Sequence, residues 1–116
     1  MEEKIQQTLQ ILEEYASEKK LVNYNVLYGQ VGLDRKNPAD RNIGSKILGE
    51  VSRITLKKNK TMLSSIVTLK GNESPAFGFY ELATELGLLK KSANENDKLR
   101  FWAEQIKKVF KAYDKQ

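Results

Sequence analysis

The chain of 116 residues contains no cysteine and no histidine. Without cysteine it cannot form disulfides or hold zinc or iron–sulfur clusters through thiolates. Without histidine it cannot build a His-based triad or a His-ligated metal site. Phosphate-loop motifs, dinucleotide-binding glycine motifs and the acid–lysine string of metal nucleases are missing as well. We therefore expect a protein that is not an enzyme and that uses no metal or other cofactor.

Long apolar runs are also lacking, and none approaches the roughly 20 residues that a membrane span needs. The first ten residues, MEEKIQQTLQ, are acidic and helical in pattern, which differs from a signal peptide. With 40% apolar and 30% charged residues, the composition is that of a soluble globular protein. We expect one domain spanning residues 1–116, a cytoplasmic location and no membrane partner.

Positive charge, in contrast, is concentrated in one segment. Residues 35–60 contain eight lysines and arginines against two acids, a net charge of +6, whereas the whole chain carries +5. The rest of the chain is therefore close to neutral. A basic segment on a neutral body is typical of a surface that binds an anion, most often nucleic acid.

Hydrophobic periodicity predicts five helices. The first carries Ile5, Leu9 and Leu12 on one stripe, and Asn23 is a candidate N-cap of the second, which Gly32 follows. Asp40 is expected to cap the third helix, and Ser92 with Glu95 to form the capping box of the last. The predicted ranges are about 2–18, 24–31, 41–57, 79–86 and 93–113.

Between the third and fourth helices the sequence predicts a β-hairpin over about 61–79. The run TMLSSIVTL at 61–69 is rich in β-branched residues, KGNESP reads as a turn, and AFGF as the returning strand. The predicted tip spans residues 71–74. The fold class is then α+β, mainly α.

The order short helix, basic helix, hairpin resembles a winged helix–turn–helix domain with a long C-terminal helix. In this resemblance the helix 41–57 is the recognition helix and KGNES is the tip of the wing. A resemblance of this kind concerns the fold and does not fix function.

A more local resemblance involves small, largely uncharacterised bacterial and phage proteins. Their pattern is a P-M-L-S-x-[IV]-V strand, then P-G-x-G-F, F-x-L-A-x-E-L-G and F-W-x-x-x-[LI]-x-x-[VI]-[FY]. The matching stretches here are MLSSIVTLKGNESPAFGFYELATELGLL and FWAEQIKKVFKAY, with IGSKILGEVS upstream. Ala76 replaces the usual glycine and Thr61 the usual proline. The resemblance implies a shared fold and a bacterial or phage origin.

The candidate site is the basic helix, on which cations would contact phosphates and Asn42 or Ser45 would reach base edges. About five neutralised phosphates would give a slope of about −4.5 in log K against log salt concentration on B-DNA. We expect DNA rather than RNA as the partner. The predicted nucleic-acid-binding residues are Arg41, Asn42, Ser45, Lys46, Arg53, Lys57, Lys58, Lys60 and Lys70.

Aromatic residues offer a second, weaker candidate. Phe77, Phe79 and Tyr80 are placed where they could stack on single-stranded bases, but their spacing favours a place in the core. Tyr24 and Tyr28 are expected to be partly buried with their hydroxyls in water.

Two other functions stay open at this point. A basic helix also fits a protein-interaction module (an adaptor, a subunit or a phage-encoded inhibitor) that docks on an acidic protein. Phe101 lies off the main apolar stripe of the last helix, so a homodimer is a third alternative.

Overall fold

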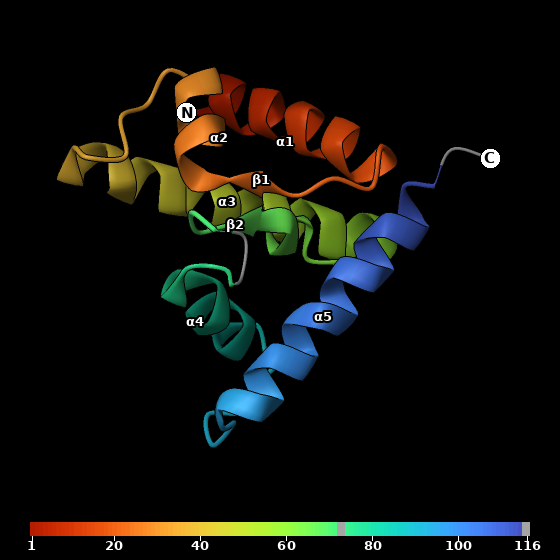
Figure 1. Ribbon diagram of the computed structural model, residues 1–116. Coiled ribbons are helices and arrows are strands. Elements are labelled where there is room, and N and C mark those ends of the chain that lie inside the picture. Colours follow the sequence, from red (N-terminus) through yellow and green to blue (C-terminus); the bar gives the residue numbers. More distant parts are fainter. Residues whose placement is uncertain (72–73, 115–116) are drawn as a thin grey trace.

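The computed structural model describes residues 1–71 and 74–114, and its fold is α+β and mainly α, as the sequence predicts (Figure 1). Its α-helices are α1 (Glu2–Ser17), α2 (Tyr24–Gln30), α3 (Pro38–Asn59), α4 (Phe77–Glu85) and α5 (Glu95–Ala112). Two short strands, β1 (Val22–Asn23) and β2 (Val67–Thr68), and a 3-10 helix, η1 (Leu63–Ile66), complete the described part.

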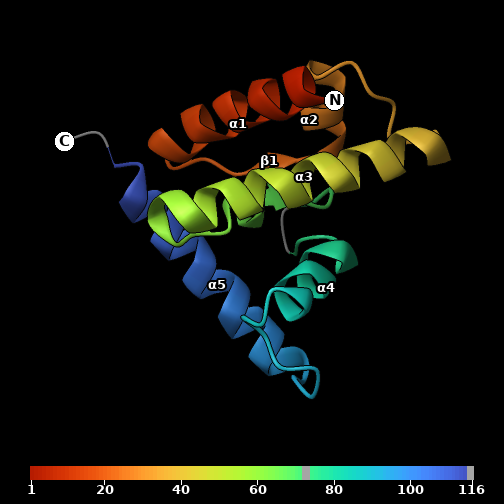
Figure 2. The same cartoon turned by 180° about the vertical axis from the view of Figure 1, so that it is seen from behind.

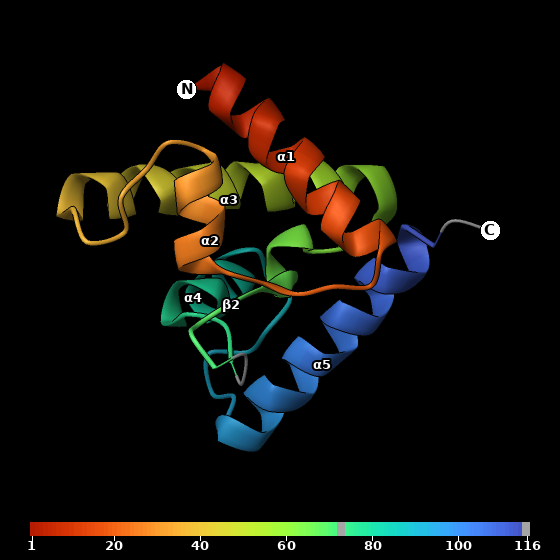
Figure 3. The ribbon, with the colours of Figure 1, turned by 45° about the horizontal axis from the view of Figure 1, so that its top comes forward.

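The main core lies between α1 and α3, with α2 beside them and η1 beneath (Figure 3). Leu12 and Ala16 on α1 and Val51 on α3 are fully buried there. Tyr28 on α2 packs directly against Gly44 on α3, where a side chain would overlap the tyrosine ring. The absence of a side chain at Gly44 thus allows α2 to lie close to α3.

The predicted β-hairpin over residues 61–79 is wrong. Within the described residues, β2 pairs with β1 instead, in parallel, with Val22 opposite Val67. The expected returning strand AFGF contributes the first turn of α4, which begins at Phe77. Residues 72–73 of the predicted tip lie outside the described residues.

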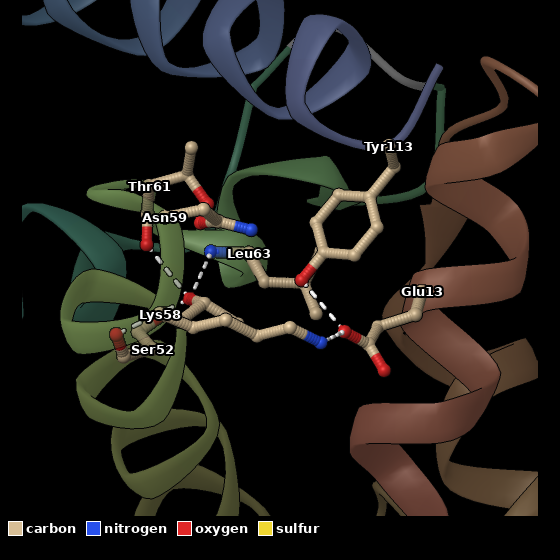
Figure 4. Close-up of polar contacts among 8 residues, drawn as sticks. Glu13, Ser52, Lys58, Asn59, Thr61, Leu63 and Tyr113 are labelled. Atoms are coloured by element: carbon tan, nitrogen blue, oxygen red, sulfur yellow. Dashed lines mark hydrogen bonds and ion pairs between the residues drawn. The ribbon is translucent and has the colours of Figure 1, made fainter. Parts of the chain in front are cut away.

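The segment 61–66 is buried and contains only the short helix η1, so side chains have to satisfy much of its backbone. Thr55 Oγ1 on α3 donates to the Thr61 carbonyl at 2.7 Å and accepts from the Leu63 amide at 3.2 Å (Figure 4). Gln105 Oε1 on α5 accepts from the Met62 amide at 3.1 Å. Trp102 Nε1 donates to the Ser65 carbonyl at 2.8 Å. These hydrogen bonds replace the strand partner that the sequence pattern suggested.

The start of α3 also differs from the prediction. Helix α3 begins at Pro38, and the Asn37 side chain caps it by accepting from the Ala39 amide at 2.8 Å. Proline is well suited to the first helical position, because its missing N–H would have no helical partner there. The Asp40 carboxylate instead accepts from the Asp34 amide at 2.8 Å and closes the preceding loop.

The capping box of α5 is formed by Asn94 and Asp97, not by Ser92 and Glu95. The prediction for α2 is confirmed, since Asn23 accepts from the Val26 amide at 2.9 Å. Gly32 follows that helix with φ of +77°, the left-handed conformation that glycine adopts most easily.

Helix α4 packs through a second, smaller core against the start of α5 (Figure 2). Phe79 is buried, and its ring lies 6.0 Å from that of Phe101, so Phe101 covers this cluster. Phe77, in contrast, is 67% exposed, and Tyr80 is half-buried. Of the three aromatics predicted in the core, one is fully buried.

No helix in the described ranges is both long and apolar enough to cross a membrane.

Candidate nucleic-acid interface

A groove of about 660 Å³ lies between α3 and α4, and its lining on α3 runs from Arg41 to Arg53. Four of the cations in segment 35–60 line it, together with three carboxylates. The cations are Arg35, Arg41, Lys46 and Arg53, and the acids are Glu50, Glu81 and Glu85. The groove therefore gathers half of the basic residues that the sequence analysis singled out.

The end of the groove nearest the α2–α3 loop is basic. The Arg35 guanidinium lies 4.7 Å from the centre of the Tyr24 ring, a cation–π contact that holds it over the loop. Arg41 Nη1 donates to the Arg35 carbonyl at 2.9 Å and to the Lys36 carbonyl at 3.3 Å. These are backbone partners, so both guanidinium charges stay available to an anion.

The two tyrosines behind this end are buried, which corrects the prediction that their hydroxyls lie in water. Tyr24 Oη accepts from the Ala76 amide at 3.1 Å, and Tyr28 Oη donates to the Arg41 carbonyl at 3.4 Å. Burial raises the pKa of both phenols above the usual value, so they stay neutral at physiological pH. They act as a rigid support for Arg35 and Arg41.

The other end of the groove has mixed charge. Arg53 Nη1 lies 3.2 Å from Glu50 Oε1, and Arg53 Nη2 lies 3.7 Å from Glu85 Oε1. The pair with Glu85 connects α3 to α4. All three side chains are substantially exposed, so each pair stabilises the fold by no more than about 1 kcal/mol. Arg53 is thus partly neutralised and less suited to a phosphate than Arg41 or Lys46.

Small residues lie between the two ends. Gly49 on α3, Gly78 on α4, Ser45 and Ser64 all line the groove. An added Cβ at Gly78 would lie 3.9 Å from Ser45 Oγ, whereas one at Gly49 would lie 3.2 Å from Arg53 Nη1 and 4.0 Å from Leu82 Cδ1. Because Gly78 is exposed and carries no side chain, a ligand backbone can approach α4 closely there.

The remaining predicted cations of α3, Lys57, Lys58 and Lys60, do not line the groove. Lys57 lies one helical turn, about 6 Å along the axis, beyond Arg53, the last residue of α3 that lines it. Lys58 Nζ pairs with Glu13 Oε2 at 2.8 Å, which also accepts from Tyr113 Oη at 2.7 Å (Figure 4). Lys57 and Lys60 are exposed at this end of the helix. The predicted cations of α3 are therefore divided between the groove and the C-terminal end of the helix.

Two further predicted residues lie outside the groove. Asn42 is exposed on α3 but does not line it. Lys70 is exposed just after β2, on a segment that does not form the expected wing. Of the nine predicted site residues, the structure brings together four: Arg41, Ser45, Lys46 and Arg53.

Helix α4 contributes residues to this site that the sequence did not predict. Gly78, Glu81 and Glu85 share the groove-facing side of that helix at helical spacing. That periodicity was available in the sequence, but the expected strand at 76–79 placed Gly78 in a hairpin. Arg35 belongs to the basic segment but not to the predicted site, because the sequence does not indicate in which direction a side chain on a loop points.

Within the described residues, no group of three or more acidic side chains is placed to hold a metal ion. Comparison with models of protein families, with curated proteins and with solved structures finds no match.

Proposed function

We propose that the protein binds nucleic acid without catalysis and that the basic end of the α3–α4 groove is the contact surface. The observation that supports this most is the convergence of Arg35, Arg41 and Lys46 on one groove whose walls include two glycines. The proposal includes a cytoplasmic location, DNA rather than RNA as the target, and membership of the bacterial and phage family that the sequence resembles.

The arrangement supports a smaller electrostatic contribution than the sequence suggests. Three cations rather than five are free of acidic partners within the groove, because Arg53 pairs with Glu50 and Glu85. Three neutralised phosphates give a slope of about −2.7 in log K against log salt on duplex DNA and about −2.1 on single strands. Helix α3 would lie with its N-terminal half along the backbone.

A fluorescence anisotropy titration tests the proposal. Labelled duplex DNA, single-stranded DNA and RNA would each be titrated at two salt concentrations, with folding confirmed by circular dichroism. Binding at low salt with a slope near the expected value supports the proposal. No binding by folded protein to any of the three would refute it.

Two charge reversals locate the surface. Lys46→Glu removes a groove cation and should weaken binding by roughly tenfold, since one charge-assisted phosphate contact contributes about 1–2 kcal/mol. Lys57→Glu makes the same change on the same helix outside the groove and should weaken binding by less than about threefold. Equal effects of the two substitutions would contradict a site in the groove.

A second function is favoured by the carboxylates at the other end of the groove. Glu50, Glu81 and Glu85 repel phosphates but suit a protein segment that carries charges of both signs. If the titrations detect no nucleic acid binding, a role as an interaction module becomes the better proposal. Homodimerisation is compatible with either function, and sedimentation measures it.

A further inference from the structure

Phe77 has an exposed aromatic ring, although it does not line the groove. It occupies the first position of α4 and is 67% exposed, although Phe79, two residues later, is buried. Phe77 and Tyr80 lie three positions apart and therefore share one side of α4. The Lys98 ammonium on α5 lies 5.8 Å from the centre of each of the two rings. Two aromatic rings and a cation thus form one cluster, in which Phe77 is the exposed ring while Tyr80 and Lys98 are partly buried.

This cluster lies next to the basic end of the groove. Gly78, the residue after Phe77, lines the groove, and a Cβ added there would point toward Ser45 on α3, 3.9 Å from its Oγ. The amide of Ala76, the residue before Phe77, donates to Tyr24 Oη, and the Arg35 guanidinium lies over the Tyr24 ring. Both chain neighbours of Phe77, Ala76 and Gly78, thus line the groove that contains the arginines.

The cluster of Phe77, Tyr80 and Lys98 can contribute to ligand binding through its aromatic surface but little through its charge. Lys98 also pairs with Glu95 at 3.7 Å, so the cluster is close to neutral and adds little attraction for phosphates. What it offers is a flat apolar ring beside a cationic groove. Proteins that bind single strands combine these two elements, a positive groove along the backbone and aromatic rings on which bases stack.

We infer that the protein prefers single-stranded nucleic acid and that Phe77 stacks on an unpaired base while Arg35, Arg41 and Lys46 hold the adjacent phosphates. This inference rests on the proposed function and specifies its substrate. In a duplex the bases are stacked inside the double helix. Its phosphates can therefore contact the groove cations, but its bases cannot stack on the Phe77 ring. Stacking tolerates any base, so little sequence preference is expected.

Phe77→Ala tests the inference, with Val26→Ala as its matched control. Val26 is also an exposed apolar residue, but it lies on α2 and does not line the groove. The probes are a labelled oligothymidine of about 12 nucleotides and a duplex of the same length. Phe77→Ala should weaken oligothymidine binding roughly 5- to 150-fold, which corresponds to the loss of one base–aromatic stack. Duplex binding by this variant, and both affinities of Val26→Ala, should change by less than about twofold.

Phe77→Trp gives a direct readout. It should retain the affinity for oligothymidine, and its added tryptophan fluorescence, taken as the difference from the wild-type signal, should be quenched on binding. Retained affinity and quenching in Phe77→Trp would show that weaker binding by Phe77→Ala results from the lost aromatic ring and not from misfolding.

The outcomes separate this inference from the proposed function. If the wild type binds both probes and Phe77→Ala weakens neither, or weakens both equally, the inference fails and the proposed function stands. If the wild type binds neither probe, both fail. If Phe77→Ala changes only the sedimentation of the protein, Phe77 is a contact between copies and the inference is overturned.

Discussion

At the scale of single residues, hydroxyl groups decide the structure of segment 61–66. Thr55 Oγ1 serves two backbone groups of that segment, the Thr61 carbonyl and the Leu63 amide. Ser52 Oγ lies 2.7 Å from Ser64 Oγ and accepts from the Ser64 amide at 3.2 Å. All of these residues are buried, so water cannot replace these partners.

Thr55→Val should therefore lower the free energy of unfolding by roughly 2–4 kcal/mol, because it keeps the shape and leaves two buried backbone groups without a partner. Chemical denaturation followed by Trp102 fluorescence measures the change. Thr84→Val is the matched control, since the partly buried Thr84 Oγ1 donates at 2.9 Å only to the Tyr80 carbonyl of its own helix α4. A loss of less than about 1 kcal/mol is expected there. If the two variants were equally stable, the account of segment 61–66 would be wrong.

A second residue-scale prediction concerns alkaline pH. Burial, followed by hydrogen bonding to Glu13, raises the pKa of Tyr113 from 10.0 to about 12. The folded state thus holds this proton more tightly than the unfolded state. Its stabilising contribution is complete below pH 10.0 and is lost as the pH rises toward about 12.

Tyr113→Phe should make the decline of stability over this pH range shallower than in the wild type. Denaturation midpoints at several alkaline pH values measure the slope, and phenolate absorbance should show one late-ionising tyrosine fewer. Other buried tyrosines also have a raised pKa, so some decline should persist in the variant. Identical pH profiles for the two proteins would contradict the assignment.

At the scale of elements, the close approach of α2 to α3 depends on Gly44. An added Cβ there would overlap the ring and hydroxyl of Tyr28. Glycine costs a helix about 1 kcal/mol relative to alanine, but overpacking a filled site costs about 1–3 kcal/mol. The steric term therefore outweighs the gain in helix propensity.

Gly44→Ala should accordingly lower stability, whereas Gly49→Ala on the same helix should leave it unchanged or raise it by up to about 1 kcal/mol. The nearest neighbours of a Cβ at Gly49 are the flexible end of Arg53 at 3.2 Å and Leu82 at 4.0 Å. Thermal unfolding of the two variants gives the comparison. A stabilising Gly44→Ala would show that α2 does not pack as described.

Several features were predictable from the sequence because their determinants are local. The N-cap at Asn23, the left-handed Gly32 and the stripe of α1 each depend on residues within a turn or two. Segment 61–66 differs, because its partners Trp102 and Gln105 lie 37 and 43 positions away from the groups that they bind. No local pattern encodes such contacts, so the β-branched composition indicated a strand.

At the scale of the whole molecule, the basic segment is divided between two regions. One region is the groove. The other is a corner where the C-terminal ends of α1, α3 and α5 meet, joined by Lys58–Glu13 at 2.8 Å and Lys19–Asp114 at 4.0 Å. Helix C-termini carry partial negative charge, which favours lysines there without any ligand. Lys57, Lys58 and Lys60 thus have a structural explanation that Arg35, Arg41 and Lys46 lack.

The candidate site was predictable as a set of cations but not as a surface. The sequence identifies Arg41, Ser45 and Lys46, because α3 is a regular helix whose residues can be placed from spacing alone. It does not show that the two ends of this helix of 22 residues lie in different places, one at the groove and the other at the corner formed by the three helix ends. Nor does it show that α4 adds Glu81 and Glu85, since that contact is tertiary.

The most direct test of the central claim is an amide NMR titration of the folded protein with a short oligonucleotide. Backbone signals of Arg35, of residues 41–49 and of Gly78 should shift, and those of residues 57–60 and 107–111 should stay in place. Shifts concentrated at the corner formed by the three helix ends, or no shifts at all, would contradict the account.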